Sequence, residues 1–143
     1  MASRFSSRRS WRPILRVIAA VLFVLAGANH FRSPIYRRII PPSFPTPELL
    51  VIISGIAEIA GGLGLLIRPL RVAAGWGLVA LLIAVFPANL YMAMHADRFA
   101  DLRIPLWALW VRLPLQGVFI AWVLYVSRDT SSRVNSATSS QPS

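Results

Sequence analysis

The feature that most constrains the fold is an unbroken apolar stretch from Leu49 to Ile67 with one carboxylate, Glu58, near its middle. At about 1.5 Å per residue, a helix of this length spans roughly 28 Å, close to the thickness of the hydrocarbon core of a bilayer. Glu58 would then lie about 14 Å from either end, where a lone ionised carboxylate is costly. The sequence therefore predicts a membrane span whose carboxylate either meets a partner from elsewhere in the chain or holds a proton.

Three further apolar stretches have the length of a membrane span, and they cover about residues 13–31, 72–94 and 104–126. The composition, 56% hydrophobic and 14% charged, is too apolar for an ordinary soluble domain. The prediction is one all-α domain, an integral membrane four-helix bundle over residues 13–126. It is flanked by a basic tail, 1–12, and a Ser/Thr-rich tail, 127–143, both expected to be disordered.

The spans are joined by the segments 32–47, 68–71 and 95–103. The first contains five prolines, which exclude a regular helix through most of it, so we expect an irregular loop. Thr46 is expected to cap the second span through its hydroxyl, with Pro47 in the first turn. The second joint is short enough to require a tight turn, which makes the second and third spans antiparallel neighbours.

Small residues recur along the second and third spans. Ser54, Glu58 and Gly62 are four residues apart and share one helix face, so Glu58 is expected to point into the bundle. The third span has its own stripe of small residues: Ala73, Gly77, Ala80, Ala84 and Ala88. Small residues at this spacing allow two helix backbones to approach closely.

Arginine counts predict the orientation in the membrane. All 15 basic residues are arginines; nine lie in or beside the tails and the 68–71 turn, and five lie in the two longer loops. Positive charge favours the cytoplasmic side, so we expect both termini in the cytoplasm. One alternative is a cleavable signal peptide, cut at Ala26-Gly27-Ala28 after the apolar part of the first span.

The polar side chains inside the four spans are expected to converge. Glu58 would lie about 14 Å and Arg112 about 12 Å below the outer boundary, which allows an ion pair between parallel spans. Four more polar residues fall in the outer half of the bundle: Gln116, Asn89, Asn29 and His30. Together they predict a polar pocket that opens outward, under a roof made by the proline-rich loop with Phe31, Tyr36 and Phe44.

Each of these side chains also has a purely structural interpretation. Glu58 and Arg112 can be an ion pair that sets helix register, and the three amides can be hydrogen bonds between helices. His30 and His95 are too few for a metal site, so no metal is expected. Without cysteine, the chain cannot form disulfides or Cys-ligated metal centres. We find neither a catalytic motif nor the basic, aromatic stripe of a nucleic-acid binder.

Several short motifs occur together between about Ala26 and Trp122. They are Asn29-His30-Phe31, Pro34 with Tyr36, Ile39-Ile40-Pro41-Pro42, the glycine-rich stretch 54–66, Phe86-Pro87-Ala88-Asn89 and Arg112-Leu113-Pro114-Leu115-Gln116. In this combination the chain resembles the DoxX-like family of small bacterial membrane proteins. The resemblance implies a four-helix bundle in the bacterial inner membrane, with family-like polar positions at Glu58, Asn89, Arg112 and Gln116.

DoxX-like proteins are linked to redox modules, among them a subunit of a thiosulfate:quinone oxidoreductase. The resemblance therefore implies a non-catalytic accessory or subunit of a quinone-linked system, with a redox enzyme as partner and quinone as possible ligand. Some relatives carry cysteines and this chain has none, which speaks against a thiol-based role. Two alternatives stay open. One is a small proton-coupled transporter in which Glu58 changes protonation as Arg112 is released, and the other is a structural assembly factor.

Overall fold

The protein folds into four long helices with short elements between them. The computed structural model describes residues 10–128. Its helices and 3-10 turns, in chain order, are α1 (Arg12–His30), α2 (Ile35–Arg38), α3 (Pro47–Leu66), η1 (Arg68–Leu70), α4 (Arg71–Met94), η2 (Ala96–Leu102) and α5 (Leu106–Ser127). The described residues contain no strand, and four helices are long and apolar enough to cross a membrane. The predicted all-α four-helix bundle is confirmed, and the protein is a multi-pass membrane protein.

The ends of the four long helices differ from the predicted ones by no more than two residues. Arg12 and Ser127 belong to helices rather than to the predicted tails, and residues 1–9 and 129–143 of those tails lie outside the described residues. The predicted cap at Thr46 is wrong. Thr46 does precede α3, but its backbone is left-handed, with φ 49°, and its side chain makes no capping hydrogen bond. Capping residues are normally extended at this position.

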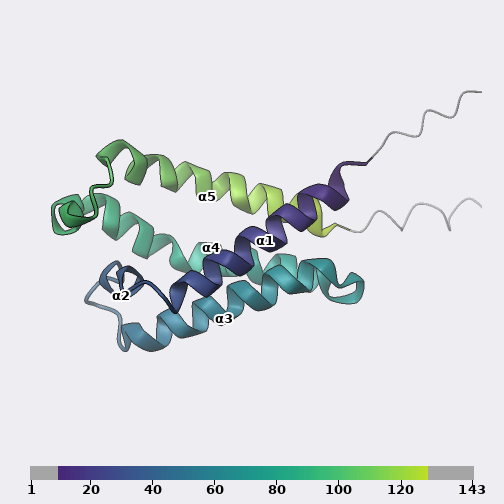
Figure 1. The fold of residues 1–143 in the computed structure, drawn as a ribbon, viewed down its shortest axis with the longest axis horizontal. Coiled ribbons are helices and arrows are strands. Elements are labelled where there is room, and N and C mark those ends of the chain that lie inside the picture. Colours follow the sequence, from purple (N-terminus) through teal and green to yellow (C-terminus); the bar gives the residue numbers. More distant parts are fainter. Residues whose placement is uncertain (1–9, 129–143) are drawn as a thin grey trace, which may run out of the picture.

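The helices run up and down the bundle in turn (Figure 1). The start of α1, the end of α5 and the α3–α4 turn lie at one end, which we call the terminal end. Helix α2 and the η2 turn lie at the opposite end, the loop end. In space α1 packs on α3, α3 on α4, and α4 on α5. The tight turn at η1 makes α3 and α4 antiparallel neighbours, as predicted.

Glycines bring α1 and α3 together at backbone contact distance. A Cβ atom added at Gly27 would lie 2.6 Å from the carbonyl oxygen of Gly55. A Cβ atom added at Gly62 would lie 2.9 Å from the carbonyl oxygen of Ala20. Real Cβ atoms do not approach a backbone oxygen so closely, so only glycine fits without a shift of the helices. The small residues of α3 therefore hold this pair of helices together.

The predicted stripe of small residues on α4 does not pack inside the bundle over most of its length. Ala73, Gly77, Ala80 and Ala84 are exposed, and a Cβ atom added at Gly77 would meet nothing within 4 Å. The expectation of close helix packing along this stripe is wrong for these four residues. A helical stripe can face either a neighbour or the surrounding lipid, and spacing alone does not distinguish the two.

Two buried clusters form the core. The one at the terminal end comprises Ala19, Phe23, Leu65, Leu78, Val79, Val123 and Val126. The one at the loop end comprises Ile39, Met92, Ala93, Phe99 and Leu109. The terminal end is closed further by Arg16, whose Nε donates to the carbonyl oxygen of Val126 at 2.9 Å. This bond ties α1 to α5 where the two helices meet.

A bidentate ion pair joins α2 to η2 and covers the loop end. Arg38 Nη1 donates to Asp101 Oδ2 at 2.8 Å, and Arg38 Nη2 donates to Asp101 Oδ1 at 2.9 Å. Nη2 also donates to the carbonyl oxygen of Arg98 at 2.9 Å, and the guanidinium carbon lies 5.5 Å from the ring centre of Phe99. The segments 32–47 and 95–103 thus contain short helical elements, α2 and η2, which we did not predict from the sequence.

We expect this ion pair to make the loop end sensitive to acid. The hydrogen bond from Arg38 lowers the pKa of the Asp101 carboxyl below its ordinary value of 3.8. Because the pKa is lowered, the pair stabilises the fold when the pH is above the pKa of Asp101 in the unfolded chain. This contribution is lost as the pH falls through the pKa of Asp101 in the folded protein. Hydrogen exchange at neutral pH should show lower protection of α2 and η2 in Asp101→Asn than in the wild type.

The difference between the two proteins should shrink in acid, as the pH falls well below 3.8 and the wild-type carboxyl takes up its proton. Asp97→Asn, a change at another exposed aspartate of η2, is the matched control and should leave protection unchanged. Equal protection of α2 in the wild type and Asp101→Asn at neutral pH would contradict the proposed role of the pair.

Candidate functional site

Two cavities of about 310 Å³ each lie between the helices. The first, the loop-end cavity, lies between α3 and α4 and below the segment that follows α2. The second, the central cavity, lies between α1, α4 and α5. Four residues line both cavities: Glu58, Val85, Asn89 and Arg112. We call these four residues the waist, because the two cavities adjoin there.

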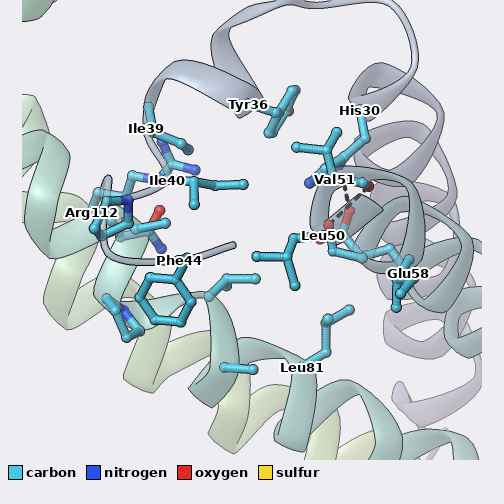
Figure 2. A pocket seen from close by; sticks show the side chains of 18 residues that line it. His30, Tyr36, Ile39, Ile40, Phe44, Leu50, Val51, Glu58, Leu81 and Arg112 are labelled. Carbon is cyan, nitrogen blue, oxygen red and sulfur yellow. Dashed lines mark hydrogen bonds and ion pairs between the residues drawn. The ribbon is translucent and has the colours of Figure 1, made fainter. Parts of the chain in front are cut away.

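The roof of the loop-end cavity comes from the segment around α2. Tyr36, Ile39, Ile40 and Phe44 line it from this side, as Figure 2 shows. The prediction of a proline-rich roof with Tyr36 and Phe44 therefore agrees with the structure. Phe31, the third aromatic residue of that prediction, is 52% exposed and does not line the cavity. The remaining lining is mostly aliphatic, so the polar groups of the cavity are concentrated near the waist.

On one side of the waist, Glu58 lies against His30. Glu58 Oε2 and His30 Nδ1 are 3.2 Å apart, and both side chains are largely buried. His30 Nδ1 also lies 3.0 Å from the carbonyl oxygen of Ala26, which can only accept a hydrogen bond. The Nδ1 hydrogen is therefore directed to Ala26, and Glu58 Oε2 has no hydrogen-bond partner within the described residues.

The predicted ion pair between Glu58 and Arg112 is wrong. Both residues reach the waist, so their depths match as expected, but Arg112 lies across the cavity from Glu58 and His30 (Figure 2). The ion pairs within residues 10–128 are His30–Glu58 and Arg38–Asp101. Rise per residue predicts the depth of a side chain along its helix, whereas the direction in which it points depends on how the helix is rotated.

Asn89 and Gln116 join α4 to α5 inside the bundle. Asn89 Nδ2 donates to Gln116 Oε1 at 2.9 Å, and both side chains are buried. Gln116 Nε2 in turn donates to the carbonyl oxygen of Leu82. Pro87 lacks an N–H and so leaves the nearby carbonyl of Ile83 without its helical partner, while the Gln116 bond goes to the carbonyl of the preceding residue. The interpretation of these amides as hydrogen bonds between helices fits the geometry.

We expect Asn89 and Gln116 to be energetically coupled. Replacing either residue by leucine should lower the free energy of unfolding by about 1 kcal/mol, the usual size of hydrogen bonds between membrane helices. The double variant should lose clearly less than the sum of the two, since each single change removes the same bond. Thermal unfolding in detergent can measure this cycle. Strict additivity would contradict the coupling.

The remaining predicted site residues lie at the end of α1. His30 lines the loop-end cavity and stacks on Tyr36, with ring centres 3.8 Å apart. Asn29 is exposed, lines neither cavity, and donates through Nδ2 to the Tyr36 hydroxyl at 3.1 Å. Asn29 therefore supports the roof rather than the waist. Residues 10–128 contain no group of three or more His, Asp or Glu side chains that could hold a metal ion.

Some lining residues were not among the predicted site residues. Phe23, Phe119 and Trp122 line the central cavity as an aromatic wall, with Phe23 edge-on to Phe119 and Phe119 stacked on Trp122. Trp122 is partly buried in the bundle. The signal available in the sequence was the three-residue spacing of Phe119 and Trp122, which places both rings on one helix face.

The chain matches one family model. The match covers residues 19–127, and the family is described as a domain of unknown function, DUF8561. The chain belongs to this family. The match to DUF8561 covers α3, α4, α5, the greater part of α1 and the waist, but it carries no statement about activity. No curated protein and no solved structure matches the chain.

Proposed function

We propose that this member of DUF8561 is a non-catalytic membrane subunit or accessory protein that holds a lipophilic molecule at the waist. In this proposal it serves a quinone-linked redox system of the bacterial inner membrane, with a redox enzyme as partner. The resemblance to DoxX-like proteins supports quinone as a possible ligand. In this proposal both termini lie in the cytoplasm, because most arginines outside the spans belong to or adjoin the two tails and the 68–71 turn in the sequence.

The observation that carries the proposal is the meeting of two largely apolar cavities at one polar waist. Small-molecule sites are typically concave and apolar with a few convergent polar groups, and both cavities fit this description. Glu58, Asn89 and Arg112 would orient the polar part of a molecule whose apolar part fills a cavity. Ionisable residues within membrane helices are costly to keep, which favours a working role for the waist.

The surroundings of the waist favour binding over catalysis. Ser54 is the serine that lines the loop-end cavity, but its Oγ donates to the carbonyl oxygen of Val51 at 3.0 Å. The hydroxyl is thus engaged with its own helix instead of with His30 or Glu58. A serine nucleophile would need a base within hydrogen-bond reach.

A second candidate function is proton-coupled transport. It is favoured by the position of Glu58, whose Oε2 has no hydrogen-bond partner in the described chain and which lines the cavities on both sides of the waist. A carboxylate between two compartments is a common proton carrier in membrane transporters. The core at the terminal end closes the bundle below the central cavity, so transport would require that core to open.

Native mass spectrometry of the full chain, purified in mild detergent, tests the main proposal. We expect the wild type to carry a bound lipophilic molecule or a co-purifying subunit. Glu58→Gln should fold normally and change the affinity for the molecule about tenfold, because it replaces the carboxyl group of the waist by an uncharged amide. Glu48→Gln, at an exposed glutamate in the first turn of α3, is the matched control and should behave as the wild type.

The possible outcomes separate the candidate functions. Loss of folded protein in Glu58→Gln alone would favour the structural assembly factor over the binding subunit. A changed pH dependence of solute flux in proteoliposomes would favour the transporter. A wild-type protein that retains neither a small molecule nor a partner subunit would overturn the proposal.

A further inference from the structure

Arg112 is a cation without a contact ion pair in the described chain, although Glu58 attracts it from across the cavity. It lies on the membrane-spanning helix α5, is exposed, and lines both cavities. The two ion pairs within residues 10–128 use other side chains, His30 with Glu58 and Arg38 with Asp101. Arginine keeps its proton in proteins, and charged side chains at membrane depth are almost always paired. We therefore expect a contact partner for this guanidinium from outside these residues.

The other polar groups around the waist already have contacts. Asn89 Nδ2 donates to Gln116 Oε1, and Glu58 Oε2 lies 3.2 Å from His30 Nδ1. No hydrogen bond to the described chain engages the guanidinium of Arg112, which has five N–H donors in a planar fork. That fork matches the two oxygens of a carboxylate, or two oxygens of a phosphate, in a bidentate contact.

The central cavity offers a path for a hydrocarbon chain. Its walls away from the waist are apolar and include Phe23 and Phe119. At its rim, Leu22 on α1 and Leu115 on α5 are each 44% exposed, so the cavity reaches the surface of the bundle between these two helices. In a membrane this surface faces acyl chains, and a chain lying in the cavity can extend there into the bilayer.

From these observations we infer that the waist binds the anionic head of a single-chain amphiphile. The carboxylate or phosphate group pairs with Arg112, and the chain lies in the central cavity and leaves the bundle between α1 and α5. This inference rests on the proposed function and narrows its ligand to an anion. A neutral lipophile would fill the cavity but leave Arg112 without a counter-charge in direct contact.

Binding of three matched probes tests the head group. The full-length protein in phosphatidylcholine nanodiscs is titrated with dodecanoate, dodecyl phosphate and 1-dodecanol, which share one chain length. We expect at least one of the two anions to bind about tenfold more tightly than the alcohol, and Arg112→Gln to remove that difference. Arg37→Gln, at an exposed arginine of α2 that lines neither cavity, is the control.

Tryptophan fluorescence tests where the chain lies. Trp11, Trp76, Trp107 and Trp110 are exposed, so replacing them by phenylalanine leaves Trp122 as a reporter in the wall of the central cavity. Dodecanoate brominated at its terminal carbon should quench Trp122 saturably, and excess unbrominated dodecanoate should restore the emission. This readout uses a protein with Arg112 intact, so it does not depend on how well Arg112→Gln folds.

Each outcome bears on a different claim. Arg112-dependent binding of either anion supports the inference, and the tighter of the two identifies the head group. Equal binding of the alcohol and both anions, unaffected by Arg112→Gln, would overturn the inference and leave lipophile binding intact. Failure of all three probes to bind the wild type would count against the proposed function as well. Non-saturable quenching of Trp122 would overturn the placement of the chain.

Discussion

Gly27→Ala is expected to destabilise the bundle by about 2 kcal/mol, even though alanine is the better helix former. The added Cβ atom would lie 2.6 Å from the carbonyl oxygen of Gly55 and 2.8 Å from a side-chain carbon of Ile59. The first contact is with backbone, so α1 and α3 must move apart along their interface. Thermal unfolding of the purified protein in detergent measures the loss.

Gly77→Ala is the matched control for this change. Gly77 also lies within a membrane-spanning helix, but a Cβ atom added there has nothing within 4 Å. We expect it to be neutral or slightly stabilising, because alanine lowers the entropy cost of forming the helix. If Gly27→Ala were as stable as Gly77→Ala, the close approach of α1 and α3 would be refuted.

Leu65→Ala should have a comparably large effect, a loss of about 2–4 kcal/mol. The Leu65 side chain is fully buried in the core at the terminal end. Removing it leaves a cavity among neighbours that can only partly collapse into it. The expected effect is a lower unfolding temperature, measured in the same detergent as for the wild type.

The next residue along α3 provides the comparison. Leu66 is 44% exposed on the outside of the bundle, so truncating it removes lipid contacts and leaves no internal cavity. Leu66→Ala should therefore change the free energy of unfolding by less than about 1 kcal/mol. A similar loss for both leucines would show that α3 does not present these residues to the core and to lipid as described.

The spans were predictable from the sequence because each is a long apolar run, and segments with prolines or arginines separate one run from the next. Helix ends could be predicted closely because the proline-rich segment 32–47 and the short joint 68–71 limit where a helix can begin or end. In the structure these ends lie within two residues of the predicted ones. The short elements α2 and η2 were not predictable. The ion pair that joins them, between Arg38 and Asp101, links residues that are 63 positions apart in the chain.

For the candidate site, the depth of each polar side chain along its helix could be predicted, but the residue that it contacts could not. Glu58, Asn89 and Arg112 all reach the waist, as expected from their positions along the spans. The partner of Glu58 is His30 instead of Arg112, because α1 packs directly on α3 through Gly27 and Gly55. Which helix lies beside which depends on packing in three dimensions, and a one-dimensional count of helical rise does not contain it.

Thiol labelling, which requires water to reach the thiol, tests most directly the central claim that the membrane bundle contains a cavity at its loop end. The chain has no cysteine, so single cysteines can be introduced without a background. Ser54→Cys and Ala88→Cys line the loop-end cavity, whereas Ile56→Cys and Ile83→Cys replace side chains that are 56% and 60% exposed on the outside of the bundle. A membrane-impermeant maleimide is added to the protein in lipid vesicles, and its reaction requires a hydrated thiolate.

We predict that the cysteines at positions 54 and 88 react with the maleimide, and that those at 56 and 83 stay unlabelled because lipid covers them. Rapid labelling at positions 56 and 83, with none at 54 and 88, would contradict both the membrane bundle and its cavity.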